Sequence, residues 1–103
     1  MSNVHIEWTQ GVARTFDPGK RFEDAAPFVS VVKLDKIGPD TVLLSADLSQ
    51  RKLSRGDIAD LKAELTAAGF ELVHCWRKIG RKVPYGGRVI RTKGQLALWE
   101  IPL

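Results

Sequence analysis

The sequence predicts an α+β fold, in which a mainly antiparallel sheet of five or six strands carries one helix across a face, in the element order βββαββ. Short runs rich in β-branched and aromatic residues recur along the chain between turn-forming residues, which is the pattern of strands. One segment, residues 54–69, has apolar residues at helical spacing between capping residues. With 103 residues, the chain is expected to form a single domain, residues 1–103.

The N-terminal region is predicted to contain a short strand followed by a long loop. Val4, Ile6 and Trp8 alternate with polar residues, a period of two that indicates a half-buried strand. The alternation lapses over residues 10–27, where Asp-Pro-Gly at residues 17–19 favours a turn, because proline presets φ and glycine accepts positive φ. We therefore expect residues 10–27 to form a loop.

A β-hairpin is predicted next along the chain. Residues 28–37 (FVSVVKLDKI) and 42–48 (VLLSADL) are rich in β-branched and other apolar residues. The turn-forming residues 38–41 (GPDT) separate the two runs. Two strand-like runs at this separation indicate an antiparallel hairpin.

The helix predicted over residues 54–69 has a beginning and an end that can be read from the sequence. Ser54 is a good N-cap, and Asp57 stands three residues later, where a capping box has its acidic partner. Gly69 can take the left-handed conformation that ends a helix, and Phe70 can pack back on the last turn. One face of the helix is apolar, formed by Ile58, Leu61, Leu65 and Ala68.

The C-terminal third is predicted to be a strand, a loop and a β-ribbon. Residues 70–79 have apolar residues on both faces, which favours a strand inside the sheet. Glycine and proline over residues 80–87 indicate a loop, and residues 88–92 and 95–101 are extended on either side of a turn at Lys93-Gly94.

An OB-like barrel is the alternative fold, because it shares this element order. OB-folds bind oligonucleotides partly through the loops after their first and fourth strands. In this chain those loops would be residues 10–27 and 80–87.

The most informative feature for function is the segregation of positive charge into residues 76–93. This basic ribbon has seven Lys and Arg residues and no acidic residue, leaving nine cations and twelve acidic residues in the rest of the chain. Such segregation costs self-repulsion and favours a polyanionic partner. The seven cations are Arg77, Lys78, Arg81, Lys82, Arg88, Arg91 and Lys93.

Two aromatic residues, Trp76 and Tyr85, accompany these cations. Cations that neutralise phosphates, together with rings that stack on bases, are what single-strand binding requires, and a two-stranded ribbon can also enter the major groove of a duplex. The sequence therefore predicts a small non-enzymatic nucleic-acid-binding or nucleic-acid-associated domain, with DNA and RNA both open. The predicted contact residues are the seven cations with Trp76 and Tyr85.

A secondary anion contact is predicted at the start of the helix. Free N–H groups at a helix N-terminus attract anions, and Arg51, Lys52, Ser54 and Arg55 lie there. The alternative is that these cations are ordinary surface residues, paired with Asp47, Asp57 or acidic residues of the loop.

An alternative function is a protein–protein adaptor or inhibitor that docks the basic ribbon on an acidic surface of a partner. An exposed edge strand can also pair two copies of the chain into a homodimer. An enzyme that uses His74 or Cys75 is disfavoured, because neighbouring residues on a strand point to opposite faces.

No metal, cofactor or membrane partner is expected. His5, His74 and Cys75 are too few and badly spaced for zinc, and no glycine pattern matches a phosphate-binding loop. A single cysteine gives no sign of an oxidising compartment, and no apolar run reaches the length of a membrane span, so we expect a cytoplasmic protein.

Overall fold

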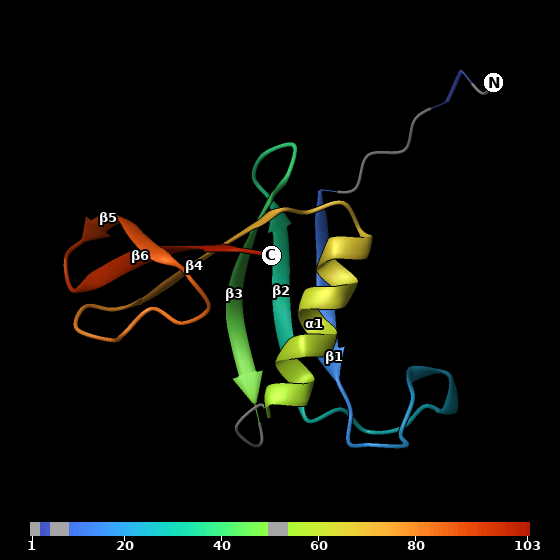
Figure 1. The fold of residues 1–103 in the computed structure, drawn as a ribbon. Coiled ribbons are helices and arrows are strands. Elements are labelled where there is room, and N and C mark those ends of the chain that lie inside the picture. The colour runs from blue at the N-terminus through green and yellow to red at the C-terminus, as the bar shows by residue number, and fades with distance from the viewer. Residues whose placement is uncertain (1–2, 5–8, 50–53) are drawn as a thin grey trace.

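The computed structural model describes residues 3–4, 9–49 and 54–103, which contain one α-helix, a short 3-10 helix and six strands. This composition confirms the predicted α+β class (Figure 1). The elements in chain order are β1 (Gln10–Thr15), η1 (Phe22–Asp24), β2 (Ser30–Lys36), β3 (Thr41–Ser49), α1 (Arg55–Ala67), β4 (Leu72–Lys78), β5 (Arg88–Lys93) and β6 (Leu96–Pro102).

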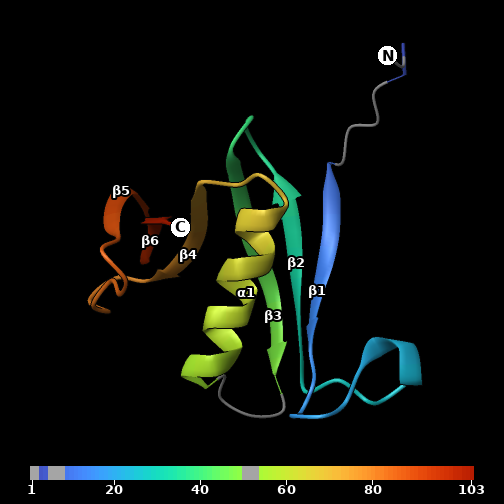
Figure 2. The same ribbon diagram turned by 45° about the vertical axis from the view of Figure 1, so that its right-hand side comes forward.

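The six strands form one mixed sheet in the order β1-β2-β3-β4-β6-β5. Every neighbouring pair is antiparallel except β3 and β4, which are parallel. A parallel pair requires a crossover connection, and α1 provides it, lying across the β1, β2 and β3 half of the sheet (Figure 2). The sheet is open, with β1 and β5 as its edges, so the barrel alternative is not confirmed.

The prediction of a loop over residues 10–27 was wrong for the first part of this range, because residues 10–15 form the edge strand β1. Gln10 pairs with Asp35 and Thr15 with Ser30, so the backbone ladder to β2 holds a segment that has no apolar alternation of its own. The loop begins at Phe16 and contains η1. The strand expected around Val4, Ile6 and Trp8 lies mostly outside the described residues.

The hairpin and the helix are confirmed. β2 and β3 pair in antiparallel fashion across the turn at residues 37–40. At the start of α1 the Asp57 N–H donates to the Ser54 hydroxyl (3.1 Å) and the Ser54 N–H donates to the Asp57 carboxylate (2.9 Å), the two bonds of a capping box. At its end Gly69 has φ 95° and the Phe70 N–H donates to the Leu65 carbonyl (3.1 Å), the longer bond of a Schellman motif.

The core lies between α1 and the face of the sheet that it covers. Val42, Leu65 and Val73 form one buried cluster, and Cys75, Ala97 and Trp99 form a second. β4 contributes to both clusters from its place between β3 and β6, so the prediction of an interior strand is confirmed. The second cluster extends the core into the C-terminal strands, where the basic ribbon lies.

Candidate nucleic-acid interface

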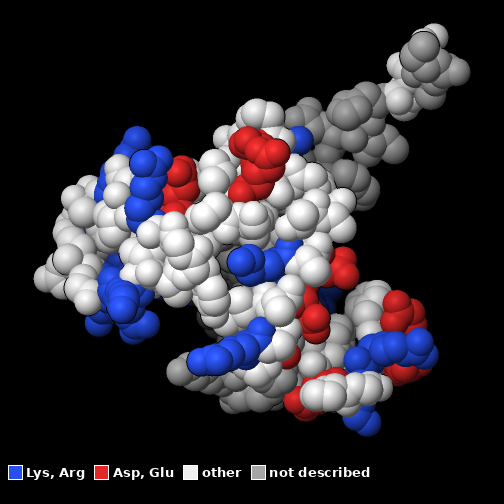
Figure 3. Space-filling view, viewed as in Figure 1, with Lys and Arg blue, Asp and Glu red and all other residues white. Residues whose placement is uncertain are grey.

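β4, β5, β6 and the loop over residues 79–87 form an extension that we call the arm (residues 72–102). β4 pairs with β3 only from Leu72 to Cys75, whereas it pairs with β6 from Leu72 to Lys78. Beyond Cys75 the arm therefore leaves β3 and projects from the helix-covered half (Figure 1). The arm carries all seven cations of the ribbon and one acidic residue, Glu100. Figure 3 shows Lys and Arg gathered over this end, with most of the visible Asp and Glu elsewhere.

The arm has two faces, and the strand registers show which side chains share each one. Cys75, Ala97 and Trp99 lie on the face toward α1, so their neighbours in sequence lie on the other, open face. No described helix covers this open face. Three rows of residues cross it from β5 through β6 to β4: Arg88, Glu100 and His74; Arg91, Leu98 and Trp76; Lys93, Leu96 and Lys78.

The second and third rows combine an aromatic ring with uncompensated positive charge. Trp76 is partly buried beside Leu98, and the exposed Arg91 completes its row. Lys78 and Lys93, both exposed, flank Leu96 in the next row. Arginine and lysine can hold phosphate oxygens while a tryptophan ring offers a stacking surface, so these rows fit a single strand of nucleic acid.

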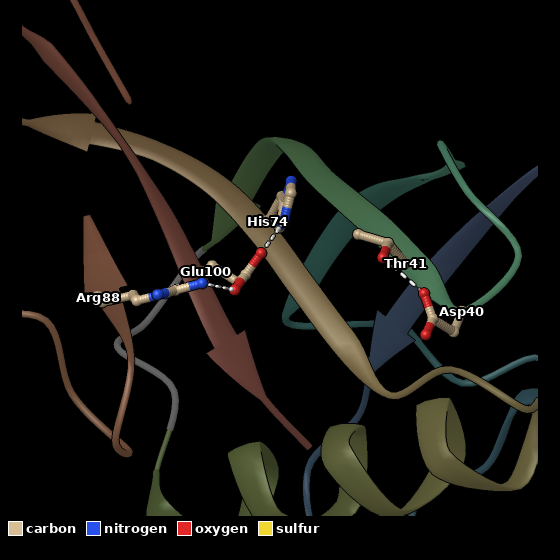
Figure 4. Close-up of polar contacts among 5 residues, drawn as sticks. All are labelled: Asp40, Thr41, His74, Arg88 and Glu100. Atoms are coloured by element: carbon tan, nitrogen blue, oxygen red, sulfur yellow. Dashed lines mark hydrogen bonds and ion pairs between the residues drawn. The ribbon is translucent and has the colours of Figure 1, made fainter. Parts of the chain in front are cut away.

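The first row is a hydrogen-bonded network that contains one ion pair, Arg88 with Glu100 (Figure 4). His74 Nε2 lies 3.0 Å from Glu100 Oε2, and Arg88 Nη2 donates to Glu100 Oε1 at 3.1 Å. The hydrogen bonds from His74 and then from Arg88 hold the pKa of Glu100 below its ordinary value. Among the seven cations of the arm, all described, Arg88 alone has an ion pair with a carboxylate, so six remain uncompensated.

Glu100→Gln is expected to reduce the acid sensitivity of the fold. A carboxyl whose pKa is depressed by folding stabilises the native state above its unfolded pKa, near 4.5, and this contribution is lost as the pH falls through the folded pKa. Denaturant unfolding at neutral pH and at several values below pH 4.5 measures the effect. The wild type should lose more stability than Glu100→Gln over this window, and equal losses would contradict the role of the network.

The face toward α1 carries other members of the predicted interface. Arg77 lies on this side, two residues along β4 from Cys75 and opposite Ala97 of β6. Burial raises the pKa of Cys75, and the charge and hydrogen bond of Arg77 offset only part of that rise. Tyr85 lies below Lys62 of α1, with the ammonium 5.4 Å from the ring centroid. Tyr85 therefore contacts the helix, whereas the strand register places Trp76 in a row of the open face.

Two further cations, Arg81 and Lys82, are exposed in the loop and belong to none of the three rows of strand residues. The nine predicted contact residues consequently divide among the open face, the helix side and the loop. The structure brings together on the open face Trp76, Lys78, Arg88, Arg91 and Lys93.

The loop is held against β6 by a close approach at Gly87. A Cβ atom added there would lie 2.6 Å from Val83 Cγ1, 2.8 Å from Ile101 Cγ1 and 3.0 Å from the Glu100 carbonyl oxygen. Two of these contacts come from β6, so the absence of a side chain lets the loop cross the strand. This close approach stands at the end of the loop, immediately before β5 begins at Arg88.

Gly87→Ala is expected to destabilise the fold by about 1–3 kcal/mol, because a methyl group must displace the loop or β6. Thermal and denaturant unfolding measure the loss. Gly38→Ala is the matched control, since an added Cβ there meets nothing closer than 3.7 Å and the turn requires no positive φ. Equal effects of the two substitutions would show that the loop does not depend on this approach.

The predicted secondary anion contact is described only in part. Arg51 and Lys52 lie outside the described residues. Ser54 uses its hydroxyl as the helix cap, and Arg55 is exposed in the first turn of α1. This contact stays a prediction.

Sequence reasoning missed two residues that shape the open face. Glu100 neutralises Arg88, and Leu98 is the buried residue that supports the Trp76 row. The alternation of residues 95–101 places both on one face, but only the pairing of β6 between β4 and β5 shows which cations they meet.

Within the described residues no group of three or more His, Cys, Asp or Glu side chains could hold a metal ion. In the same part of the chain no helix combines the length and apolar character needed to cross a bilayer. No protein-family model matches the chain, and searches of curated proteins and of solved structures find no match. The geometry of the arm is therefore the basis for the function proposed below.

Proposed function

We propose that the chain is a non-enzymatic domain that binds single-stranded nucleic acid on the open face of the arm. The observation that carries the proposal is the pair of rows in which Trp76 lies among Arg91, Lys78 and Lys93. None of these three cations has an ion pair within the described residues. An uncovered face with stacking and phosphate-binding groups side by side is the arrangement that single-strand binders use.

The binding mode follows from the rows. Lys78 and Lys93 hold phosphates as point charges, and Arg91 can donate two parallel hydrogen bonds to one phosphate. Trp76 stacks on a neighbouring base, and Leu96 and Leu98 supply apolar contact beneath it. All of these groups contact the backbone or ring faces, so the expected binding has little sequence preference.

The test is a titration of labelled single-stranded oligonucleotides, DNA and RNA, at two salt concentrations. Binding should weaken steeply with salt, because each phosphate contact releases about 0.7 counterions from a single strand. A duplex of the same sequence serves as the comparison and should bind more weakly, since its bases are not free to stack on Trp76. Affinity that does not change with salt, or no binding to any oligonucleotide, would refute the proposal.

A protein partner is the second candidate, and the edge strand β5 favours it. Val89 and Ile90 are 47% and 40% exposed on this strand, which has one free backbone edge. Such an edge can accept a strand from an acidic partner or from a second copy of the chain. A stoichiometric protein that copurifies with the chain and stays bound after nuclease treatment would support this candidate over nucleic acid.

A further inference from the structure

A cavity of about 440 Å³ lies beneath α1, at the point where β4 parts from β3. Ile58 and Leu61 line it from the helix, Leu44 from β3, and Trp99 and Ile101 from β6. Pro84 and Tyr85 of the loop complete its wall. Its volume is within the range of pockets that hold small molecules, about 300–1,000 Å³. The cavity therefore lies on the helix side of the arm, and Trp76 of the second row also borders it.

The cavity wall contains a buried hydrogen-bond donor without an acceptor. Trp99 is only 7% exposed, and its indole Nε1–H has no hydrogen-bond partner among the residues that the structure describes. Buried polar groups are nearly always paired, and leaving a donor unsatisfied costs free energy. The donor is sealed from water, so a molecule in the cavity contacts the Trp99 ring rather than this N–H.

The charged residues at the cavity are all cations. Lys62 of α1 and Arg77 of β4 line it, and none of the described lining residues is Asp or Glu. Arg77 shares a face of β4 with Cys75, the face toward α1, and both residues line the cavity. A molecule in the cavity thus meets positive charge on one side and aliphatic and aromatic surface on the others.

We propose that this cavity binds a small aromatic carboxylate. The flat apolar body lies between α1 and the aromatic wall formed by Trp99 and Tyr85, where rings pack well against rings. The carboxylate accepts hydrogen bonds from Arg77, with Lys62 as a second positive charge. Trp76 borders both this site and the proposed nucleic-acid surface, but the two cations of the cavity, Lys62 and Arg77, lie outside the rows of the open face.

The rate at which the Cys75 thiol is labelled reports whether the cavity is occupied, because Cys75 is the only cysteine in the sequence and lines the cavity. The probe is 2-naphthoate, titrated by calorimetry and by the rate at which a thiol reagent labels Cys75 in the folded protein. We expect saturable binding at one site and slower labelling as the site fills. Neutral 2-naphthamide, which has the same body, should bind at least about tenfold more weakly, the size expected for a lost charged hydrogen bond.

Three variants test the contacts. Arg77→Gln should weaken naphthoate binding by about tenfold or more, because it removes a charged donor. Trp99→Phe should weaken binding by about fivefold, because it reduces the aromatic wall. Lys78→Gln removes the same charge one residue away on the opposite face, so naphthoate should bind it as it binds the wild type. Because Arg77 is exposed, its variant keeps the test valid even if Trp99→Phe does not fold.

The outcomes separate the two proposals. Naphthoate binding that Arg77→Gln weakens and Lys78→Gln leaves unchanged supports the cavity site, whether or not the chain binds nucleic acid. Absence of saturable binding, unchanged Cys75 labelling, or equal losses in the two variants would overturn it. Oligonucleotide binding is measured on the same variants, where Lys78→Gln should have the larger effect.

Discussion

Arg91→Glu combined with Lys93→Glu is expected to weaken binding to single-stranded nucleic acid by about 25-fold or more at 0.1 M salt. The variant loses two phosphate contacts, so binding releases about 1.4 fewer counterions, and at 0.1 M salt this corresponds to a loss of about 25-fold in affinity. The new carboxylates add repulsion. The slope of log affinity against log salt should shrink by about 1.4. Both side chains are exposed on the edge strand, so the fold should be preserved. Oligonucleotide titrations over a range of salt concentrations measure both quantities.

Arg81→Glu combined with Lys82→Glu is the matched control for that prediction. It changes the net charge by the same amount, but both residues lie in the loop rather than in the rows of the open face. Long-range attraction falls equally in the two double variants, whereas only the first loses direct contacts. A larger loss from the loop variant would place the nucleic acid on the loop and contradict binding at the open face.

The helix could be predicted in detail because its determinants are local. Ser54, Asp57, Gly69 and Phe70 lie within a few residues of the helix ends that they define, and all four act as their residue types predict. The hairpin of β2 and β3 is equally local. Elements that form through contacts between neighbours in the sequence leave a readable pattern there.

β1 could not be predicted, because its strand conformation depends on a partner that lies far along the chain. Residues 10–15 contain glycine, alanine and three polar residues, and their sequence alone resembles a loop. Pairing with β2 supplies the hydrogen bonds that make them a strand. Edge strands are half solvated, so they need little apolar alternation.

The composition of the candidate site was predicted, but its geometry was not. Charge clustering shows in the sequence which residues are cationic, whereas a β-bulge decides where they point. Arg88 and Arg91 are three positions apart and would face opposite sides of a regular strand. The register shifts between Val89 and Arg91, so both lie opposite residues of the open face, Glu100 and Leu98. No local feature of the sequence predicts that shift.

The insertion of β6 between β4 and β5 is the other non-local determinant of the site. It places Leu98 between Trp76 and Arg91, and Glu100 between His74 and Arg88. Glu100 thereby neutralises Arg88, whereas Arg91 on the same strand has no ion pair among the described residues. The sequence order alone would have placed β5 beside β4, with different neighbours for every cation.

The open face stays accessible because α1 is fixed on the opposite face, and Leu65 is the residue that fixes it. Leu65 is 4% exposed and packs with Val42 of β3 and Val73 of β4, which joins the crossover helix to both strands of the parallel pair. Leu61 and Phe70 pack around the same cluster. Removal of the Leu65 side chain would leave a void at the junction of the helix, the central sheet and the base of the arm.

Leu65→Ala is therefore expected to destabilise the fold by about 2–5 kcal/mol, the cost of a buried Leu→Ala substitution. Glu64→Ala, one position away and exposed, is the control and should change stability by less than about 0.5 kcal/mol. Denaturant unfolding of both variants measures the difference. Since α1 anchors β4 as well as β3, near-ultraviolet circular dichroism of the arm tryptophans should be lost in the same transition. A separate, unchanged transition for the arm would show that it folds independently of the helix.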